Sequence, residues 1–135
     1  MKRFILSVAV AISSLSSLSA FAHEAKLPNS GGLQEVKARD GREILADSKA
    51  LTVYTFAPDK ADESVCYKAC AKEWPPVLVV GTEPLVAPYG TTKRTDGTVQ
   101  VTYNHRPLYN YDDDKVQGDI FGDGKHDVWF VVEVK

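Results

Sequence analysis

The chain has little positive charge and no long hydrophobic run. Its 135 residues include 16 Lys and Arg against 18 Asp and Glu, a net charge of −2. Nucleic acids and anionic membrane surfaces both select basic protein surfaces, so the charge balance argues against either as a partner. The apolar run at residues 4–12 is shorter than the roughly 20 residues that a membrane-spanning helix needs. We therefore expect no membrane span.

The sequence also lacks the short motifs that identify common catalytic sites. It contains no Gly-x-Ser-x-Gly elbow, no phosphate-binding P-loop and no His-Glu-x-x-His. The Cys-x-x-Cys-His pattern of haem attachment is absent as well. Carboxylates are abundant, but their abundance does not identify a glycosidase pair. These absences favour a protein that is not an enzyme and give no strong indication of a cofactor.

The first 22 residues have the pattern of a secretory signal peptide. A basic start and the apolar run precede a small polar stretch, and Ala20-Phe21-Ala22 supplies the small-x-small cleavage pattern. No cysteine lies near this site, so nothing indicates a lipid anchor. We expect cleavage near Ala22 and a soluble periplasmic or secreted product of 113 residues with a net charge of −4. Its residues 23–35 are expected to form an N-terminal tail.

Two stretches of the remaining chain share one pattern at a spacing of 55 residues. VYTFAPDK at residues 53–60 matches LYNYDDDK at residues 108–115. The matched positions are Tyr54 and Tyr109, Phe56 and Tyr111, Asp59 and Asp114, Lys60 and Lys115, Trp74 and Trp129, Val77 and Val132, and Val79 and Val134. Aromatic residues, an aspartate and a tryptophan at one constant spacing indicate an internal duplication.

The duplication defines two copies of one unit. Upstream of the shared motif, Asp40-Gly41 matches Asp96-Gly97 with a slip of one residue. We place the copies at about residues 36–80 and 92–135, joined by the Pro- and Gly-containing segment at residues 81–92. A chain of this size suits a single domain.

Each copy is expected to consist of strands. Val99, Val101 and Tyr103 alternate toward one face before a turn at residues 104–107, which is typical of a hairpin. The first copy turns near residues 47–49 and matches this pattern less cleanly. Only residues 64–73 favour helix, for a turn or two. The prediction is an all-β domain at residues 36–135, with two pseudo-repeated meander or hairpin units that share one core.

The last segment of each copy should also be a strand. VWFVVEVK, at the end of the chain, is rich in β-branched and aromatic residues. Its counterpart in the first copy contains Pro75 and Pro76, which cannot donate to a strand ladder. Strand pairing in that copy is therefore expected to begin after Pro76.

The acidic run Asp112-Asp113-Asp114 combines two kinds of position. Asp59 and Asp114 both follow the second aromatic residue of the motif by three positions, where the strand should end. A carboxylate there accepts backbone N–H groups and stabilises the turn, so both are predicted to be structural. Asp112 and Asp113 replace Ala and Pro of the first copy, so the shared fold does not explain their charge.

Cys66 and Cys70 are the two cysteines of the chain. In an oxidising compartment a disulfide is the default expectation, and a redox-active or metal-binding pair is the alternative. Phe121 and Lys125 occupy the matching positions of the second copy, so a disulfide is possible only in the first.

The corresponding loop of the second copy is rich in glycine and aspartate. Calcium binds carboxylate and carbonyl oxygens, so Asp119, Asp123 and Asp127 are candidate ligands, together with Asp112 and Asp113. The spacing fits neither an EF-hand loop nor the nonapeptide calcium repeat. A glycine-rich turn, in which Asp side chains bond turn N–H groups, is the alternative.

Three histidines remain as candidates. His105 lies in the predicted hairpin turn, where a solvated turn residue is the simplest interpretation. His126 neighbours Asp127 and could titrate with it, although one such pair does not make a catalytic set. His23 would begin the processed chain. An amino terminus with an imidazole can bind copper, because copper favours nitrogen ligands. A flexible tail explains His23 equally well.

The duplicated motifs resemble those of a known family. Tyr-x-aromatic-x-x-Asp occurs twice, Cys-x-x-x-Cys-x-x-x-Trp-Pro-Pro once, and Gly-Asp-x-x-Gly-x-Gly precedes the second tryptophan. In combination they resemble the secreted repeats of unknown function, which are exported or lipoprotein-type proteins. The resemblance covers nearly the whole processed chain and implies an exported repeat protein, for which the family offers no established activity.

These observations favour one function and leave two others open. The favoured function is a non-catalytic binding or interaction module of the cell envelope, with an unidentified envelope protein or small ligand as its partner. Its duplicated aromatic residues would either fill the core or line a platform for a flat ligand. The first alternative is a periplasmic metal-binding or redox accessory protein, with calcium or copper as the possible metal. An envelope hydrolase that uses Asp or His126 is the third.

Overall fold

The structure is a computed structural model that describes residues 29–135. The predicted signal peptide at residues 1–22, its cleavage site and His23 lie outside the described residues. Of the helices in the described part, none has the length and apolar character of a membrane span.

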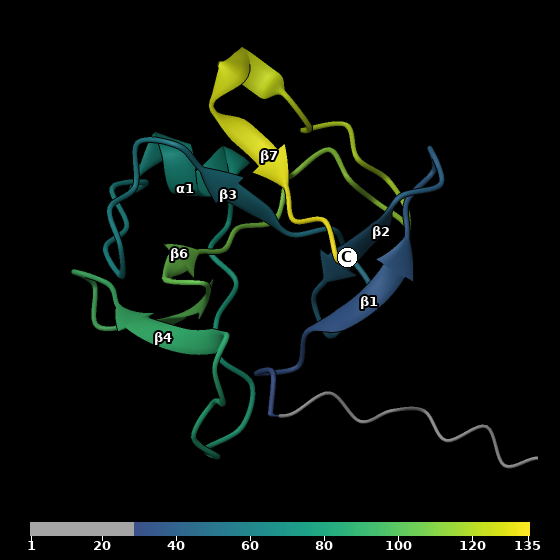
Figure 1. Ribbon diagram of the computed structural model, residues 1–135. Helices are drawn as coiled ribbons and strands as arrows, with labels where there is room; N and C mark the ends of the chain where they lie inside the picture. Colours follow the sequence, from purple (N-terminus) through teal and green to yellow (C-terminus); the bar gives the residue numbers. More distant parts are fainter. Residues whose placement is uncertain (1–28) are drawn as a thin grey trace, which may run out of the picture.

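The described residues form short strands with very little helix, which confirms the all-β prediction. The elements in chain order are β1 (Gln34–Lys37), β2 (Glu43–Ala46), β3 (Tyr54–Phe56), α1 (Ala69–Glu73), β4 (Tyr89–Lys93), β5 (Val99–Tyr103), β6 (Arg106–Pro107), the 3₁₀ turn η1 (Lys125–Asp127) and β7 (Trp129–Val131). They pair antiparallel as β1–β2, β3–β7 and β4–β5–β6. Figure 1 shows β7, near the end of the chain, lying beside β3 of the first copy.

The first hairpin of each copy has the same register. In the first, Gln34 pairs with Ala46, and in the second Gly90 pairs with Thr102, a shift of 56 residues in both strands. Each turn contains Asp-Gly, and the glycines adopt positive φ values of 95° at Gly41 and 87° at Gly97. Such values strain other residues, which explains the shared Asp-Gly sequence of the two turns.

The two copies are interleaved rather than placed side by side. Leu45 of β2 donates its N–H to the carbonyl of Val132, in the last segment of the second copy, at 2.9 Å. In the matching bond, Val101 of β5 donates to Val77, in the last segment of the first copy, at 2.8 Å. Each copy thus completes its hairpin with a strand from the other, and the hydrophobic core is shared.

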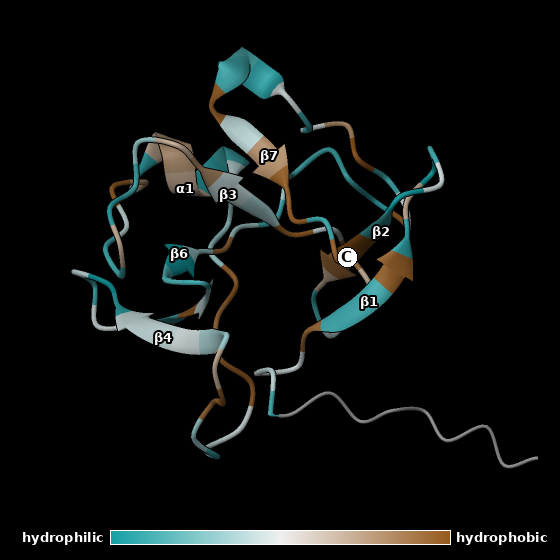
Figure 2. Ribbon diagram, in the orientation of Figure 1, coloured by the Kyte–Doolittle hydropathy of each residue, from teal (hydrophilic) through white to brown (hydrophobic). Residues whose placement is uncertain are grey.

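Hydrophobic residues gather on the inward sides of these elements. One cluster of buried residues surrounds Leu45, Val101 and Leu108, and a second contains the motif aromatics. Figure 2 shows hydrophobic colour along β2 and hydrophilic colour at the η1 turn and at β6.

Two local predictions are wrong. Pairing in the first copy does not wait until after Pro76, because Asn110 donates to Pro75 and Val77 donates to Leu108, so that Pro76 stands opposite Tyr109. Pro76 occupies a position whose N–H would point away from the partner, and its missing donor therefore breaks no ladder bond.

The second concerns β4. This strand begins at Tyr89, inside the segment interpreted as a linker. The sequence did not predict it there, because Gly-Thr-Thr gives a weak strand signal. In β5, which has the expected strand conformation, Gln100 and Thr102 are as buried as Val101, so both faces of the strand are covered. Gln100 is satisfied there by donating to the Leu108 carbonyl at 2.7 Å and accepting from Arg94 at 2.9 Å.

Gly122 lies against the aromatic rings of Trp74 and Tyr111, and replacing it tests how closely these rings pack. A Cβ atom built on Gly122 would lie 2.6 Å from Trp74 Cη2 and 3.0 Å from Tyr111 Cγ. Gly122→Ala is therefore expected to lower the free energy of unfolding by about 2 kcal/mol through overpacking, measured by urea denaturation. Phe121→Ala, at the neighbouring exposed ring, is the control and should cost clearly less. Equal costs for the two variants would show that the Trp74 and Tyr111 rings can move to admit the added methyl group.

Candidate functional site

The duplicated motif forms a pair of reciprocal bonds between the copies. Tyr54 donates its hydroxyl to Asp114 Oδ2 at 2.6 Å, and Tyr109 donates its hydroxyl to Asp59 Oδ2 at 2.6 Å. The same tyrosines exchange backbone bonds, at 2.7 Å from Tyr54 N to Tyr109 O and 3.0 Å in reverse. The tyrosine of each motif is thus bonded to the aspartate of the other motif.

The second oxygen of each aspartate holds a backbone turn. Asp59 Oδ1 accepts the N–H of Val65 at 2.8 Å, and Asp114 Oδ1 accepts the N–H of Phe121 at 2.9 Å. Each carboxylate therefore links the loop that follows it in the chain to the tyrosine of the other copy. Sequence reasoning placed the aspartates at the bends but missed the tyrosines as their partners.

Six aromatic rings of the motif pack around the junction of the copies. The indoles of Trp74 and Trp129 stack with centroids 3.8 Å apart and an interplanar angle of 2°. Tyr111 stacks on the outer face of Trp74 at 4.3 Å, and Phe56 on that of Trp129 at 4.2 Å. Tyr54 meets Trp74 edge-on at 5.3 Å, and Tyr109 meets Trp129 edge-on at 5.2 Å. These rings fill the interior and do not line a ligand platform.

Burial sets the ionisation of the buried acids and phenols. It raises the pKa of Asp59 and of Asp114 above the ordinary value, against the opposing effect of the tyrosine hydroxyls that bond their charged forms. Burial also raises the pKa of Tyr54 and Tyr109, and the neighbouring carboxylates raise it further. Both phenols therefore act as hydrogen-bond donors at neutral pH.

Arginines of one copy fasten the loop of the other. Arg94 is buried and donates to Ser64 Oγ at 2.9 Å and to the Cys66 carbonyl at 2.6 Å, while its guanidinium lies over the Tyr67 ring. Its Nε has no partner among the described residues. In the other direction, Arg39 bonds Asp119 at 2.5 Å. These arginines were not singled out from the sequence, although each lies in a first hairpin, next to an Asp-Gly turn.

Cys66 and Cys70 form a disulfide with a Cα–Cα distance of 5.3 Å. Cys66 is fully buried against the ring cluster, and the bond closes the loop that leads into α1. In the second copy Lys125 takes the place of Cys70 and lies over the Tyr111 ring at 4.8 Å. The two loops thus cover the ring cluster by different means.

The acidic residues of the second loop have separate partners. Asp119 accepts the N–H groups of Lys115 and Val116, and these bonds, with Arg39, hold its pKa below the ordinary value. Asp123 pairs with Arg42 at 2.6 Å and accepts the N–H of Val131 at 3.1 Å.

The remaining candidate ligands are equally dispersed. Asp113 accepts the Tyr111 hydroxyl at 3.0 Å, Asp112 lies 4.0 Å from Lys115 Nζ, and Asp127 belongs to the η1 turn. Within residues 29–135 no group of three or more His, Cys, Asp or Glu side chains is arranged to hold a metal ion. The structure does not bring the five proposed calcium ligands together.

The two described histidines both lie in turns. His105 occupies the two-residue turn between β5 and β6, with φ at 64°, and its Nδ1 lies 2.8 Å from Asp62 Oδ2. His126 and Asp127 lie in the η1 turn with φ values of 53° and 58°.

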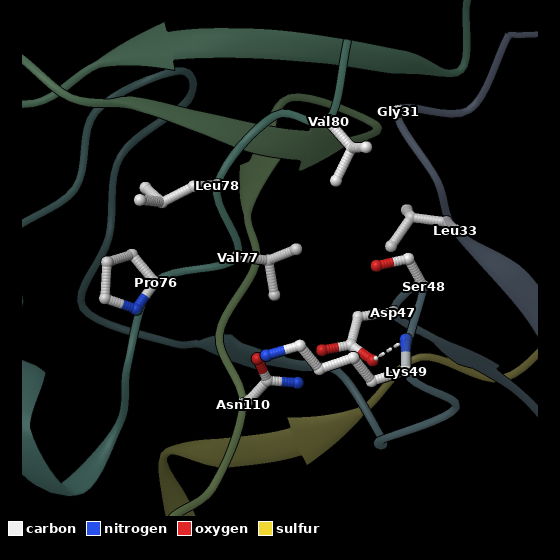
Figure 3. Close-up of a pocket in the computed structure, with 10 residues that line it drawn as sticks. All are labelled: Gly31, Leu33, Asp47, Ser48, Lys49, Pro76, Val77, Leu78, Val80 and Asn110. Carbon is white, nitrogen blue, oxygen red and sulfur yellow. Dashed lines mark hydrogen bonds between the residues drawn. The ribbon is translucent and has the colours of Figure 1, made fainter.

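A surface groove of about 620 Å³ is lined by residues that include Tyr89, Thr102 and His105. A second surface groove has a volume of about 210 Å³. One wall is formed by Pro76, Val77, Leu78 and Val80, and the other by Gly31, Leu33 and the turn at Asp47–Lys49, with Asn110 between them at one end. Figure 3 shows the Lys49 side chain extending from its turn toward Asn110. Sequence analysis did not identify this surface, because its walls come from three separate segments.

The reciprocal bonds predict matched effects of tyrosine substitution. Tyr54→Phe and Tyr109→Phe each remove the hydroxyl donor of a buried carboxylate, and each is expected to lower the free energy of unfolding by about 1–3 kcal/mol, measured by urea denaturation. Double-mutant cycles with Asp114→Asn and Asp59→Asn should give coupling energies of similar size. Tyr103→Phe, whose hydroxyl has no hydrogen-bond partner in the described residues, is the control. A cost confined to one tyrosine would contradict the symmetry.

The raised pKa of Asp114 predicts a pH dependence of stability. A carboxyl whose folded pKa is raised contributes stability below its unfolded pKa and loses it as the pH rises through the folded pKa. Relative to Asp114→Asn, the wild type should therefore gain stability as the pH falls from neutral toward about 4, measured by urea denaturation. Asp40→Asn is the control, because the Arg42 N–H lowers the pKa of Asp40 and the sign reverses. A difference independent of pH would contradict the assignment.

The comparisons with known proteins agree with the internal duplication. The family model described as "secreted repeat of unknown function" matches the chain twice, at residues 35–78 and 90–133. Neither a search of curated proteins nor a search of solved structures found a match. The two matched segments contain the interleaved hairpins and both copies of the tyrosine and aspartate motif, and together they cover more than half of the chain. The chain belongs to the family of secreted repeats of unknown function.

Proposed function

We propose that the protein is a non-catalytic binding module that works in the periplasm or outside the cell, after cleavage near Ala22. The signal-peptide pattern supports the compartment, and the description of the family as secreted agrees with it. The partner would be an envelope protein or a small ligand.

The buried motif residues and the exposed groove residues have separate roles, and this separation supports the proposed function. The motif tyrosines, tryptophans and aspartates bond and stack with one another in the interior. They serve as the framework that both copies require, and a partner would meet residues outside it. The groove supplies such residues, since Leu78 and Val80 are exposed at its wall.

One contrast between the copies carries the proposal. Leu78 and Val80 are 44% and 58% exposed, and the positions that match them in the second copy carry Glu133 and Lys135. Because both copies have the same strand arrangement there, the fold does not require apolar side chains at these positions. Exposed apolar residues that the fold does not require are typical of an interaction surface.

Site-specific crosslinking in the native host tests the proposal. A photoreactive amino acid in place of Leu78 should give discrete crosslinked adducts, and one in place of Val116, 58% exposed on another loop, should not. Adding Val80→Lys should remove the adducts, because it places a charge in the groove. Identical adduct patterns at the two positions, or none at Leu78, would overturn the binding function of this face.

A further inference from the structure

The wall of the groove at residues 76–80 has an unpaired backbone edge. On one side this segment bonds β5 and residues 108–110, through Val77 and Val79. The N–H and C=O groups of Leu78 and Val80 have no partner in the part of the chain that the structure describes. An edge of this kind is a template for one more strand.

The second copy shows how the same edge is protected. Val131, which matches Pro76, donates its N–H to Asp123 Oδ1 at 3.1 Å, so the second loop covers that part of the edge. Charged Glu133 and Lys135 stand at the next two matching positions, and charges on an edge strand discourage pairing with another chain. In the first copy Pro76 supplies no donor to the edge, and Leu78 and Val80 lack both of these forms of protection.

The groove also has an exposed ammonium group, at the same turn as the Asp47 carboxylate, which accepts the N–H groups of Lys49 and Leu51. Lys49 is exposed, lines the groove and forms no salt bridge with a described residue. The corresponding turn of the second copy is one residue shorter and contains His105, which lies beside Asp62. The side-chain oxygen of Asn110 accepts no hydrogen bond from a described residue, and the side-chain nitrogen donates to Thr52 O. A carboxylate of a partner could form an ion pair with Lys49 at this end of the groove.

The size of the groove favours a few side chains over a whole small molecule. Its volume of about 210 Å³ is below the roughly 300–1,000 Å³ usual for small-molecule sites. Strand addition needs little volume, because main-chain bonds supply affinity and alternate side chains supply specificity.

We infer that the groove binds an extended peptide segment of another protein, which pairs with the edge at Leu78 and Val80 and places a carboxylate beside Lys49. Alternate apolar side chains of that segment pack against Leu78 and Val80. This inference rests on the binding function proposed above and names the chemical class of the partner.

Selection from a peptide library tests the inference. The exported product of the full chain is used to select from a random nine-residue library displayed on phage, after depletion of the library on the Leu78→Glu/Val80→Lys variant. That variant reproduces the side chains of the second copy and is therefore expected to fold, which circular dichroism checks. Selected peptides should alternate apolar residues and share one acidic position. Selection of no peptide, or of peptides without these features, would overturn the inference.

Backbone methylation of a selected synthetic peptide separates strand addition from simple apolar contact. N-methylation at the alternate residues that pair with the edge should weaken binding at least tenfold, and at the intervening residues it should have little effect, measured by fluorescence anisotropy. Equal tolerance at all positions would overturn strand addition. Lys49→Gln should weaken binding of the acidic peptide about five- to tenfold and leave its amide analogue unchanged.

Two further outcomes separate this inference from related ones. Sedimentation that shows a dimer, abolished by Leu78→Glu/Val80→Lys, would assign the edge to a second copy of the chain and overturn the peptide inference. Crosslinks from position 78 without any selected peptide would preserve the binding function and refute the peptide. Failure of both experiments would refute the proposed function itself.

Discussion

The structure depends on the exchange of bonds between its two copies. Tyr54 and Tyr109 pair with each other through the backbone, and each hydroxyl reaches the aspartate of the opposite copy. A buried tyrosine needs a partner for its hydroxyl, and a buried carboxylate needs donors, so each group satisfies the other. The stacked indoles of Trp74 and Trp129 lie beside this exchange and join the two halves of the core. One copy alone would leave both its tyrosine hydroxyl and its aspartate without these partners.

Once the shared framework is known, the differences between the copies become informative. Each loop covers the ring cluster, yet one is closed by the Cys66–Cys70 disulfide and the other is held by Arg39, Arg42 and carboxylates. These are alternative solutions to one structural requirement. Leu78 and Val80 are different, because no requirement of the fold accounts for exposed apolar groups where the other copy is charged. The groove therefore combines the features from which we infer a partner.

Much of the fold could be predicted, because the duplicated aromatic residues and Asp-Gly turns are short-range patterns. The interleaving could not, since a constant spacing shows which residues are equivalent but not whether partners belong to the same copy. Alternation predicted the strand β5 but not the burial of both its faces, on one of which Gln100 bonds Arg94 and Leu108. Acidic spacing suggested a calcium site, whereas Asp119 and Asp123 are paired with arginines that lie 80 or more residues away in the sequence.

Native-state hydrogen exchange at the Tyr54 and Tyr109 amides tests the central claim most directly. Because each amide bonds the carbonyl of the other tyrosine, the account predicts that both exchange only through global unfolding, with the same free energy and the same dependence on denaturant. Exchange of one amide through a smaller, local opening while the other stays protected would show that the copies unfold separately, and it would contradict the account.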